Sequence, residues 1–415
     1  MAASDPRYKW RLVAFLFFVA ALNYGDRTAT SSVFPLLRRD LRMSDLQLAA
    51  IGSFFLWSYA IGSPVAGYLA DHISRSRLVA WSLAAWSLIT LATGFAPNAE
   101  VLLASRALLG FAECLYLPAA IALLADHHAS DTRATAMGLH IAGLSVGLVA
   151  GGAMAGYFGE HYGWRLSFYL LGGLGLVMAA AAPFILRDAA PKPVEVVAVP
   201  PVRSNLGLIV RIPSFWILLS QAMIVSIGTW IFFNWLPLYF NETYHLSLAG
   251  AGFSAPLVIQ GSGVAGVAFG GWFSDRVAGT QPARRMLAQS LFYFAAAPFL
   301  LAFLSRPAFA ILIACIFCFS MLRALGGSNE NAMLCDLLPP RLRSTAVGLT
   351  NAANTFAGGV GVLVAGYLKR DYGLGGVFGG ISAIMALGAL LLLIGYLWFV
   401  RRDLARFTAS TFALH

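Results

Sequence analysis

Charged side chains are scarce in this chain. Lys, Arg, Asp and Glu make up 11% of its 415 residues, hydrophobic residues make up 59%, and the mean hydropathy is +0.75. A soluble domain carries about 25% charged residues, so the composition excludes an ordinary soluble protein and predicts an integral membrane protein. The strands of a membrane β-barrel would alternate apolar with polar residues, and the apolar runs of this chain do not.

Grouped reactive side chains are also lacking. Cys315 and Cys318 have the spacing of a metal-binding pair, but no second Cys or His pair accompanies them, so we interpret the cysteines as small packing residues. All four lie in apolar runs: Cys114, Cys315, Cys318 and Cys335. The sequence contains no combination of a nucleophile with a base and no cluster of metal ligands. We therefore expect no metal, no cofactor and no enzymatic activity.

Long apolar runs are the main feature that is present. About twelve runs of 18 or more residues can be marked, and each is long enough as a helix to cross a hydrocarbon layer of about 30 Å. The first run continues to about Ser32 with charges inside it and no small-residue cleavage site after it, so it predicts a helix and not a signal peptide. The predicted fold is an all-α membrane protein with twelve transmembrane helices. The helices are expected at residues 11–32, 46–70, 78–97, 101–125, 133–157, 164–186, 213–239, 248–273, 286–304, 307–335, 344–368 and 374–400.

The basic residues are divided unevenly between the two sides of these predicted helices. The net charge is +10, and of the 28 Lys and Arg residues 18 lie on the side of both termini, seven on the other side and three within the membrane. The positive-inside rule then places both termini in the cytoplasm. The basic excess therefore indicates topology and not nucleic-acid binding. We expect a multi-pass, monomeric protein of the cell inner membrane, surrounded by membrane lipids.

A Pro-rich segment divides the chain into two halves that resemble each other. We predict an N-terminal six-helix bundle over residues 1–187, a cytoplasmic linker over 188–212 and a C-terminal six-helix bundle with a short tail over 213–415. Aligning 133–163 with 343–373 gives twelve identities in 31 positions, and GYLAD at 67–71 echoes GWFSD at 271–275. Two parallel repeats of this kind are typical of rocker-type transporters, whose substrate site lies between the halves near the membrane midplane.

Two apolar runs contain an arginine and a glutamate seven residues apart. Arg106 and Glu113 form the first pair, Arg323 and Glu330 the second. Seven residues are about two helical turns, so both side chains of a pair share one face, and a charge at bilayer depth costs roughly 2.5–3.5 kcal/mol on insertion scales. Glu113 either carries a proton or forms a permanent salt bridge. Arg323 and Glu330 are expected in the cytoplasmic half of the tenth helix, as a gating or interdomain pair.

Several other polar residues lie within the predicted helices. Asp26 and Arg27 in the first helix form either a structural pair or a site in which Arg27 anchors an anion, because a guanidinium matches a carboxylate. Tyr59 either lines a cavity or packs against neighbours. His140 is either a cavity residue or a satisfied interior histidine. Asn351 and Asn354, three residues apart, either contact substrate or join helices.

Charged residues also mark the loops on the predicted cytoplasmic side. Asp71, Arg75 and Arg77 follow the second helix, where they either clasp neighbouring helix ends or are a cap and a positive-inside cluster. Asp275 is the counterpart of Asp71 in the second half. We assign these residues, with Arg323 and Glu330, to gating and conformational change.

The motifs resemble a known family. GYLADHISRSR at 67–77 and GWFSDRVAG at 271–279 resemble the two copies of the signature loop of the major facilitator superfamily. Four further segments resemble its anion:cation symporter group, which transports organic anions with protons: NYGDR at 23–27, RALLGFAECLYLPA at 106–119, NWLPLYF at 234–240 and TNAANTFAGG at 350–359. Leu144 stands where organic-acid members often have a polar amide, which leaves a smaller or more apolar acid open.

This resemblance implies roles for particular residues. Arg27 would bind the substrate carboxylate with help from Arg106, and Tyr24 and Tyr59 would line the site. Asp26 and Glu113 would be linked to the proton, and Asn351 or Asn354 would contact the substrate from the second half. The predicted function is proton-coupled symport of a small organic carboxylate by alternating access. The alternatives are a Spinster-like transporter of lysolipids or sphingolipids, which would need an apolar cavity open to lipid, and a proton-coupled drug antiporter.

Overall fold

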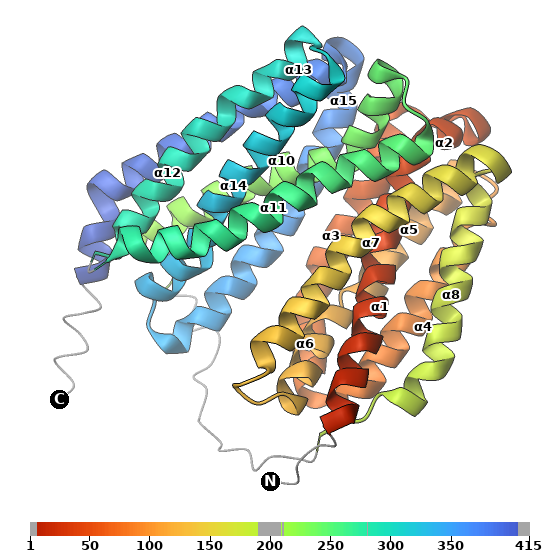
Figure 1. Cartoon of the computed structure of the whole chain (residues 1–415), viewed down its shortest axis with the longest axis horizontal. Helices are drawn as coiled ribbons and strands as arrows, with labels where there is room; N and C mark the ends of the chain where they lie inside the picture. The colour runs from red at the N-terminus through yellow and green to blue at the C-terminus, as the bar shows by residue number, and fades with distance from the viewer. Residues whose placement is uncertain (1–5, 190–208, 210, 280, 406–415) are drawn as a thin grey trace. The chain divides into compact units, whose positions relative to one another are not determined.

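The computed structural model describes residues 6–189, 209, 211–279 and 281–405 (Figure 1). Helices make up most of these residues, as the continuous apolar runs predict. In chain order they are α1 (Pro6–Ser32), α2 (Phe34–Leu41), α3 (Asp45–His72), α4 (Arg75–Thr93), α5 (Ala99–Glu113), α6 (Tyr116–His127), α7 (Arg133–Tyr162), α8 (Trp164–Ile185), α10 (Pro213–Tyr244), α11 (Leu248–Ala278), α12 (Arg284–Ala296), a 3₁₀ turn (Ala297–Leu301), α13 (Ala302–Ser305), α14 (Phe309–Leu337), α15 (Pro340–Ile394) and a π-helical turn (Gly395–Phe399).

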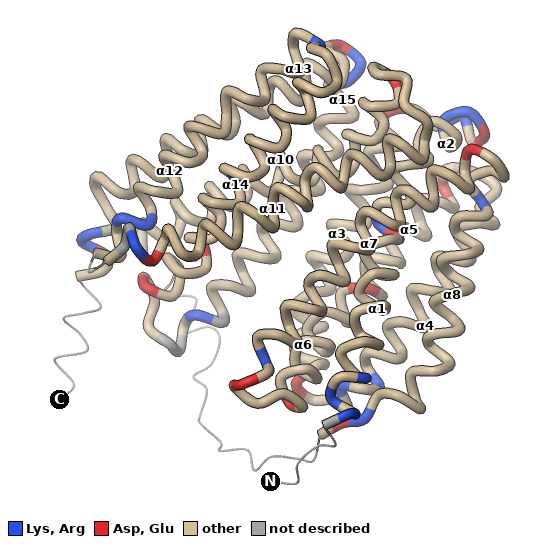
Figure 2. The backbone as a smooth tube through the Cα atoms, in the orientation of Figure 1, with Lys and Arg blue, Asp and Glu red and all other residues tan. Residues whose placement is uncertain are grey.

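The helices account for the predicted spans. Within the described ranges, nine candidate spans are long and apolar enough to cross a membrane, and one of them, Thr345–Ala405, has 61 residues and covers two predicted helices. Gly373 divides that long helix, since its φ of 65° lies in the left-handed region that favours glycine. With α1 and α4, which carry more polar residues, the count reaches the twelve helices predicted. Figure 2 shows most charged positions near helix ends and few along the helices.

The fourth predicted helix is interrupted. Residues 101–125 were expected to form one helix, but α5 ends at Glu113 and α6 begins at Tyr116. Pro118 has no N–H group, so it cannot donate to the carbonyl of Cys114 four residues earlier. The interruption places Glu113 at the end of a helical segment.

The chain separates into two compact units. Among the described residues, unit 1 contains α1 to α8 together with Phe233–Leu257 and Val362–Tyr367, and unit 2 contains the rest of α10, α11 and α15 with α12 to α14. Most of the predicted linker, residues 188–212, lies outside the described residues. The structure does describe Asp188, whose carboxylate accepts hydrogen bonds from the Ser76 amide and from the hydroxyls of Ser74 and Ser76 at the start of α4.

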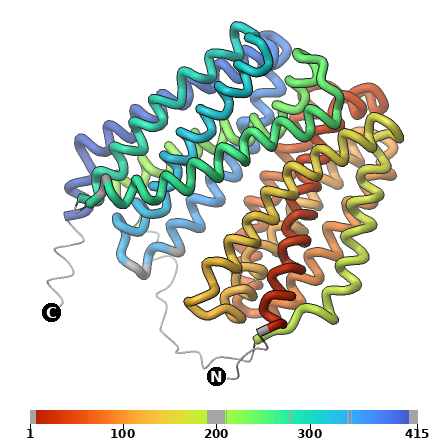
Figure 3. Tube along the Cα trace, viewed as in Figure 1, coloured from red at the N-terminus to blue at the C-terminus, as the bar shows by residue number. Residues whose placement is uncertain are grey.

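Glycines allow α1 and α7 to lie against each other in unit 1, as the trace in Figure 3 shows. A Cβ atom added at Gly147 would lie 2.1 Å from the carbonyl oxygen of Ala21, and one added at Gly151 would lie 2.3 Å from the Cα atom of Gly25. Small residues at this spacing let helix backbones approach closely. The hydroxyl of Thr28 also donates to the Leu148 carbonyl at 2.9 Å. This contact fixes the part of α1 that carries Asp26 and Arg27.

Candidate functional site

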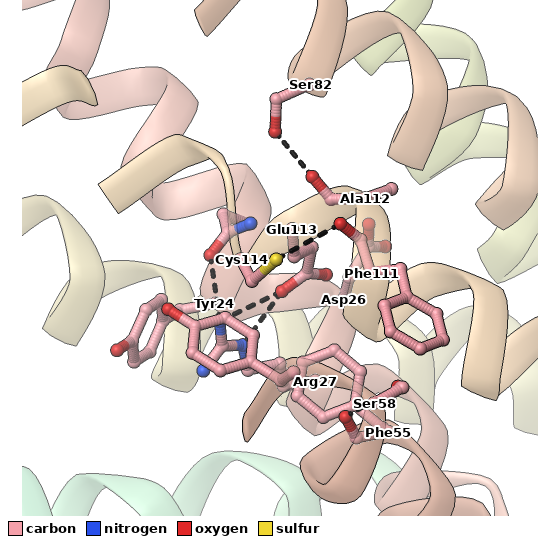
Figure 4. Close-up of polar contacts among 12 residues, drawn as sticks. Tyr24, Asp26, Arg27, Phe55, Ser58, Ser82, Phe111, Ala112, Glu113 and Cys114 are labelled. Atoms are coloured by element: carbon pink, nitrogen blue, oxygen red, sulfur yellow. Dashed lines mark hydrogen bonds and ion pairs between the residues drawn. The ribbon is translucent and has the colours of Figure 1, made fainter. Parts of the chain in front are cut away.

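An ion pair between α1 and α5 lies inside unit 1 (Figure 4). The Nε atom of Arg27 donates to Oε2 of Glu113 at 3.0 Å, and Nη2 of Arg27 lies 2.9 Å from the same oxygen. The Arg27 side chain is 10% exposed and that of Glu113 is fully buried. Arg27 also donates to the Asn23 side chain at 3.3 Å, one helical turn earlier. The pair that the structure forms is therefore Arg27–Glu113.

Three aromatic rings surround the Arg27 guanidinium. Its Cζ atom lies 4.2 Å from the ring centre of Tyr24, 4.9 Å from that of Phe55 and 5.1 Å from that of Tyr59. A cation within about 6 Å of an aromatic face is attracted by the ring's charge distribution. Tyr24 and Tyr59, which the family resemblance assigns to the site, thus do lie at Arg27. Phe55 was not singled out, because an apolar ring within an apolar helix gives no sequence signal.

Arg106 lies in the same cluster but, unlike Arg27, has no ion-pair partner among the described residues. It is 3% exposed, its Cζ atom lies 5.4 Å from the ring centre of Phe55, and its Nε atom has no hydrogen-bond partner. Within the part of the chain that the structure describes, Arg106 forms no ion pair. The sequence predicted an acid–base pair of Arg106 with Glu113 on one helix face, but Glu113 is paired across to α1. Arg106 is therefore a buried cation whose charge no contacting carboxylate neutralises.

Asp26 completes the charged cluster. It is 1% exposed, and its Oδ2 atom accepts a hydrogen bond from the Thr90 hydroxyl of α4 at 2.9 Å, while Oδ1 has no partner. Ser82, also on α4, donates to the carbonyl of Ala112 at 2.6 Å and so holds the backbone next to Glu113. Two arginines and two acids thus converge from α1 and α5. With all four ionised, their charges sum to zero, so gain or loss of a single proton leaves the cluster charged.

His140 lies apart from this cluster's ion pair. It is 1% exposed, and its Nε2 atom is 2.9 Å from the Tyr116 hydroxyl, which also donates to the carbonyl of Leu16. Of the two interpretations that the sequence left open, this geometry favours the satisfied interior histidine. His140 therefore ties α6 to α7.

The second Arg–Glu pair of the sequence lies in unit 2, on α14. Asn354 of α15 lies near the Glu330 carboxylate, and its Oδ1 atom is without a hydrogen-bond partner. Asn351 is exposed. Arg323 is the middle residue of α14, with fourteen residues on either side. Among the described residues, no ion pair joins Arg323 to Glu330, so the proposed gating pair is not formed in this structure.

Several ion pairs lie at the predicted cytoplasmic ends of the helices. Arg75 pairs with Asp126 at the end of α6, whereas Asp71 and Arg77 are exposed. In unit 2, Arg285 lies 3.0 Å from Asp275 and 3.3 Å from Asp336. The sequence analysis did not identify the partners Asp126, Arg285 and Asp336. A signal was available for two of them, because Asp126 and Asp336 are 210 residues apart, the same offset that aligns 133–163 with 343–373.

Asp188 lies outside the membrane-spanning helices, and its pKa differs from the ordinary value of an aspartate. Partial burial by itself raises its pKa, but hydrogen bonds from Ser74 and Ser76 outweigh burial and hold the pKa of Asp188 below its usual value. Within the described ranges, no group of three or more His, Cys, Asp or Glu side chains is placed to hold a metal ion.

These features define a class of protein, namely a multi-pass helical membrane protein with a buried cluster of ionisable side chains inside its N-terminal unit. The sequence matches the family model of the Major Facilitator Superfamily over residues 16–283 and 261–411. Because the match covers nearly the whole chain, the protein belongs to that superfamily of membrane transporters. The fold and family predicted from the sequence are confirmed.

The similar proteins include several anion transporters. The probable galactarate/D-glucarate transporter GudP of Escherichia coli (strain K12) is 26% identical over 95% of this chain and 93% of its own length. The probable anion transporter 1, chloroplastic, of Oryza sativa subsp. japonica is 25% identical over 92% of this chain and 75% of its own. A bacterial homolog of the human lysosomal transporter Spinster has a similar structure, with a TM-score of 0.78 at 18% identity over 97% of this chain and 99% of its own. The structural likeness supports the fold alone.

Proposed function

We propose that this protein is a proton-coupled symporter that carries a small organic carboxylate across the cell inner membrane by alternating access. The observation that carries the proposal is the buried cluster of Asp26, Arg27, Arg106 and Glu113, in which Arg106 has no ion-pair partner among the described residues. A cation at this depth has a high free-energy cost unless an opposite charge or a bound anion neutralises it. The similarity to proteins named as anion transporters agrees with an anionic ligand.

The charges of the cluster supply a coupling mechanism. With both acids ionised, the cluster is neutral and Glu113 holds Arg27 at 2.9 Å. A proton on Glu113 removes the charge that holds Arg27, and the cluster gains a net charge of +1. An anion then finds two available guanidiniums, whose planar forks match a carboxylate. Because each ligand makes the other's binding more favourable, the coupling between proton and anion is reciprocal.

Alternating access requires that the ligands act on the equilibrium between conformational states. A ligand shifts that equilibrium only by the difference between its affinities for the two states. The proton and the carboxylate together replace the internal Arg27–Glu113 contact, so the loaded and empty states differ in their internal contacts. In this proposal Tyr24 and Tyr59 line the bound anion, and Asn351 and Asn354 contribute polar contacts. A monomer with cytoplasmic termini suffices for the cycle.

Transport by purified protein in liposomes tests the proposal. Uptake of a labelled carboxylate library is measured with and without an inward proton gradient, for the wild type and for Arg27→Ala, Arg106→Gln and Glu113→Gln. Arg39→Ala is the control, because that arginine is largely exposed and pairs with its sequence neighbour Asp40. We expect gradient-stimulated uptake that both arginine variants lose and that Arg39→Ala retains.

The Glu113→Gln variant separates binding from coupling. A neutral amide leaves Arg27 available but cannot release a proton, so exchange of internal for external anion should survive while gradient-driven accumulation disappears. Unimpaired accumulation by this variant would remove Glu113 from the coupling step. Absence of uptake of every carboxylate in the library by the wild type would refute the proposal.

A lipid substrate is the second candidate. Protein spinster homolog 1 of Homo sapiens is 26% identical over 87% of this chain and 74% of its own length. Movement of a fluorescent lysolipid between the leaflets of the same liposomes is therefore measured in parallel. Lysolipid movement without carboxylate uptake would replace the symporter proposal by this one.

A further inference from the structure

The charged residue at the centre of α14 has no role in the mechanism proposed above. Arg323 has fourteen residues of the helix on either side. At a rise of about 1.5 Å per residue, it lies roughly 21 Å from each end of α14. An arginine near a helix end can extend its long side chain to the membrane interface, but this one is too far from both ends. Its charge must therefore be accommodated at membrane depth.

The surroundings of Arg323 do not neutralise that charge. Within the described residues, Arg323 has no hydrogen-bond partner, no ion-pair partner and no aromatic ring under its guanidinium. Glu330 follows seven residues later, about two helical turns or roughly 10 Å along the axis, and its carboxylate lies near Asn354. Tyr293 of α12 is the other ionisable group nearby, and it is fully buried. Arg27 in unit 1, by contrast, is held by Glu113.

Partial exposure makes this cation available. Arg323 is half-buried, and Met321, Leu322, Leu325 and Gly327 on the same helix are also only partly covered within unit 2. Asn354, which lies near Glu330, also has an Oδ1 atom without a hydrogen-bond partner. A structural role would require a partner that removes the cost of the charge, and the described contacts contain none. A ligand of opposite charge would remove it.

We infer that Arg323 is an anion-binding residue of unit 2, so that the protein binds anionic groups at a second place besides the cluster of unit 1. The ligand chemistry is that of a carboxylate or a small inorganic anion. Two sources supply it: a second acidic group on the transported substrate, or a free anion such as chloride. The inference holds whether or not transport is coupled to protons, and it replaces the gating role that the sequence suggested for Arg323.

Anion binding by the full-length protein in lipid nanodiscs tests this inference. The melting temperature is followed as chloride, butyrate or succinate is added at constant ionic strength, with Arg106→Gln present throughout to remove the unpartnered cation of unit 1. Butyrate and succinate have four carbons each and differ by one carboxylate. We expect at least one of these anions to raise the melting temperature, Arg323→Gln to abolish that rise, and Arg323→Lys to retain part of it.

Glu330→Gln gives a second readout that a folding defect cannot imitate. Removing a negative charge roughly 10 Å along the helix from the binding cation should strengthen anion binding, on the order of tenfold at an effective dielectric constant of about 20. The half-saturating anion concentration should therefore fall in this variant. Stabilisation by succinate well above that by butyrate would identify a second acidic group of a substrate, and an equal effect of chloride would identify a free anion.

Two results would overturn the inference. The first is a rise in melting temperature with anion that is as large in Arg323→Gln as in the protein without that substitution. The second is that none of the three anions raises the melting temperature and that Glu330→Gln does not strengthen anion binding. Failure of the symporter proposal has a different signature. In that case proton-driven uptake is absent, while the Arg323-dependent anion response remains.

Discussion

Replacement of Gly147 by alanine tests whether the close approach of α1 and α7 positions the charged cluster. The added Cβ atom would lie 2.1 Å from the Ala21 carbonyl oxygen, 2.6 Å from its Cα atom and 2.7 Å from its carbonyl carbon. All three are backbone atoms, so no side-chain rotation can relieve the contact. Restoring an ordinary contact of 3.4 Å requires a separation of about 1.3 Å between the helices. Overpacking of this kind costs about 1–3 kcal/mol.

The functional effect follows from the position of Arg27 on the same helix. Arg27 lies six residues after Ala21, and its contacts with Glu113 are 2.9 Å and 3.0 Å long. A shift of α1 by about an ångström lengthens these contacts beyond ordinary hydrogen-bond distance. We therefore expect Gly147→Ala to lower the melting temperature by several degrees and to reduce carboxylate uptake at least tenfold.

Gly138→Ala is a matched control on the same helix. A Cβ atom at Gly138 meets no other atom within 4 Å, and both substitutions gain the same helix propensity of about 1 kcal/mol. The difference between the two variants therefore measures the clash alone. Differential scanning fluorimetry in detergent and liposome uptake provide the two readouts. Equal melting temperatures and equal uptake for the two variants would refute this account of how α1 is held.

Substitutions at three further contacts probe the structure outside the Arg27–Glu113 ion pair. Thr90→Val removes the hydroxyl that donates to Asp26 and should cost about 1.5–3 kcal/mol of stability, since a hydrogen bond to a charged group has that value; Thr90→Ser should restore most of it. Arg75→Asp and Asp126→Arg should each reduce transport, and the double variant should recover part of it, because the ion pair is then re-formed in reverse. Asp188→Asn should reduce the free energy of unfolding at pH 7 by less than about 1 kcal/mol, because the group is exposed, and the melting temperature should fall slightly.

Each of these predictions has an outcome that contradicts it. Equal stability of Thr90→Val and Thr90→Ser would show that the hydrogen bond to Asp26 contributes nothing. A double charge reversal no better than the single variants would reject the ion pair as the cause. For Asp188, a pKa below the ordinary value means that its contribution is present above about pH 4 and is lost as the pH falls through the lowered pKa. The difference between wild type and Asp188→Asn must therefore shrink in acid, and a constant difference would be inconsistent.

The fold could be predicted from the sequence because a membrane permits few backbone conformations. An apolar run of about 20 residues in lipid must be a helix that satisfies its own backbone. The depth of Arg27, Arg106 and Glu113 follows from the same runs. The assignment of the proton-linked and substrate-linked residues stays a prediction.

The choice of partners could not be read from the sequence. Arg106 and Glu113 share a helix face by periodicity, but Glu113 pairs with Arg27 because the helix packing brings α1 to α5. The helix α1 is also held against α7 by backbone approach at Gly147 and Gly151, which no pattern of charges indicates. The sequence did not single out Thr90 either, because a threonine within an apolar helix does not by itself indicate which residue it contacts. The partner Asp126 could have been found from its repeat counterpart Asp336.

The size of the uncharged residue Phe55 affects the spacing of the two arginines in the cluster. Its ring lies 4.9 Å from the Arg27 guanidinium and 5.4 Å from that of Arg106, so one uncharged side chain acts as a spacer between two cations. A smaller or larger residue there would alter the gap between the two positive groups while leaving the proton balance untouched. Under the proposed function, a substitution at Phe55 would therefore change the size of acid that the site accepts, although Phe55 itself carries no charge.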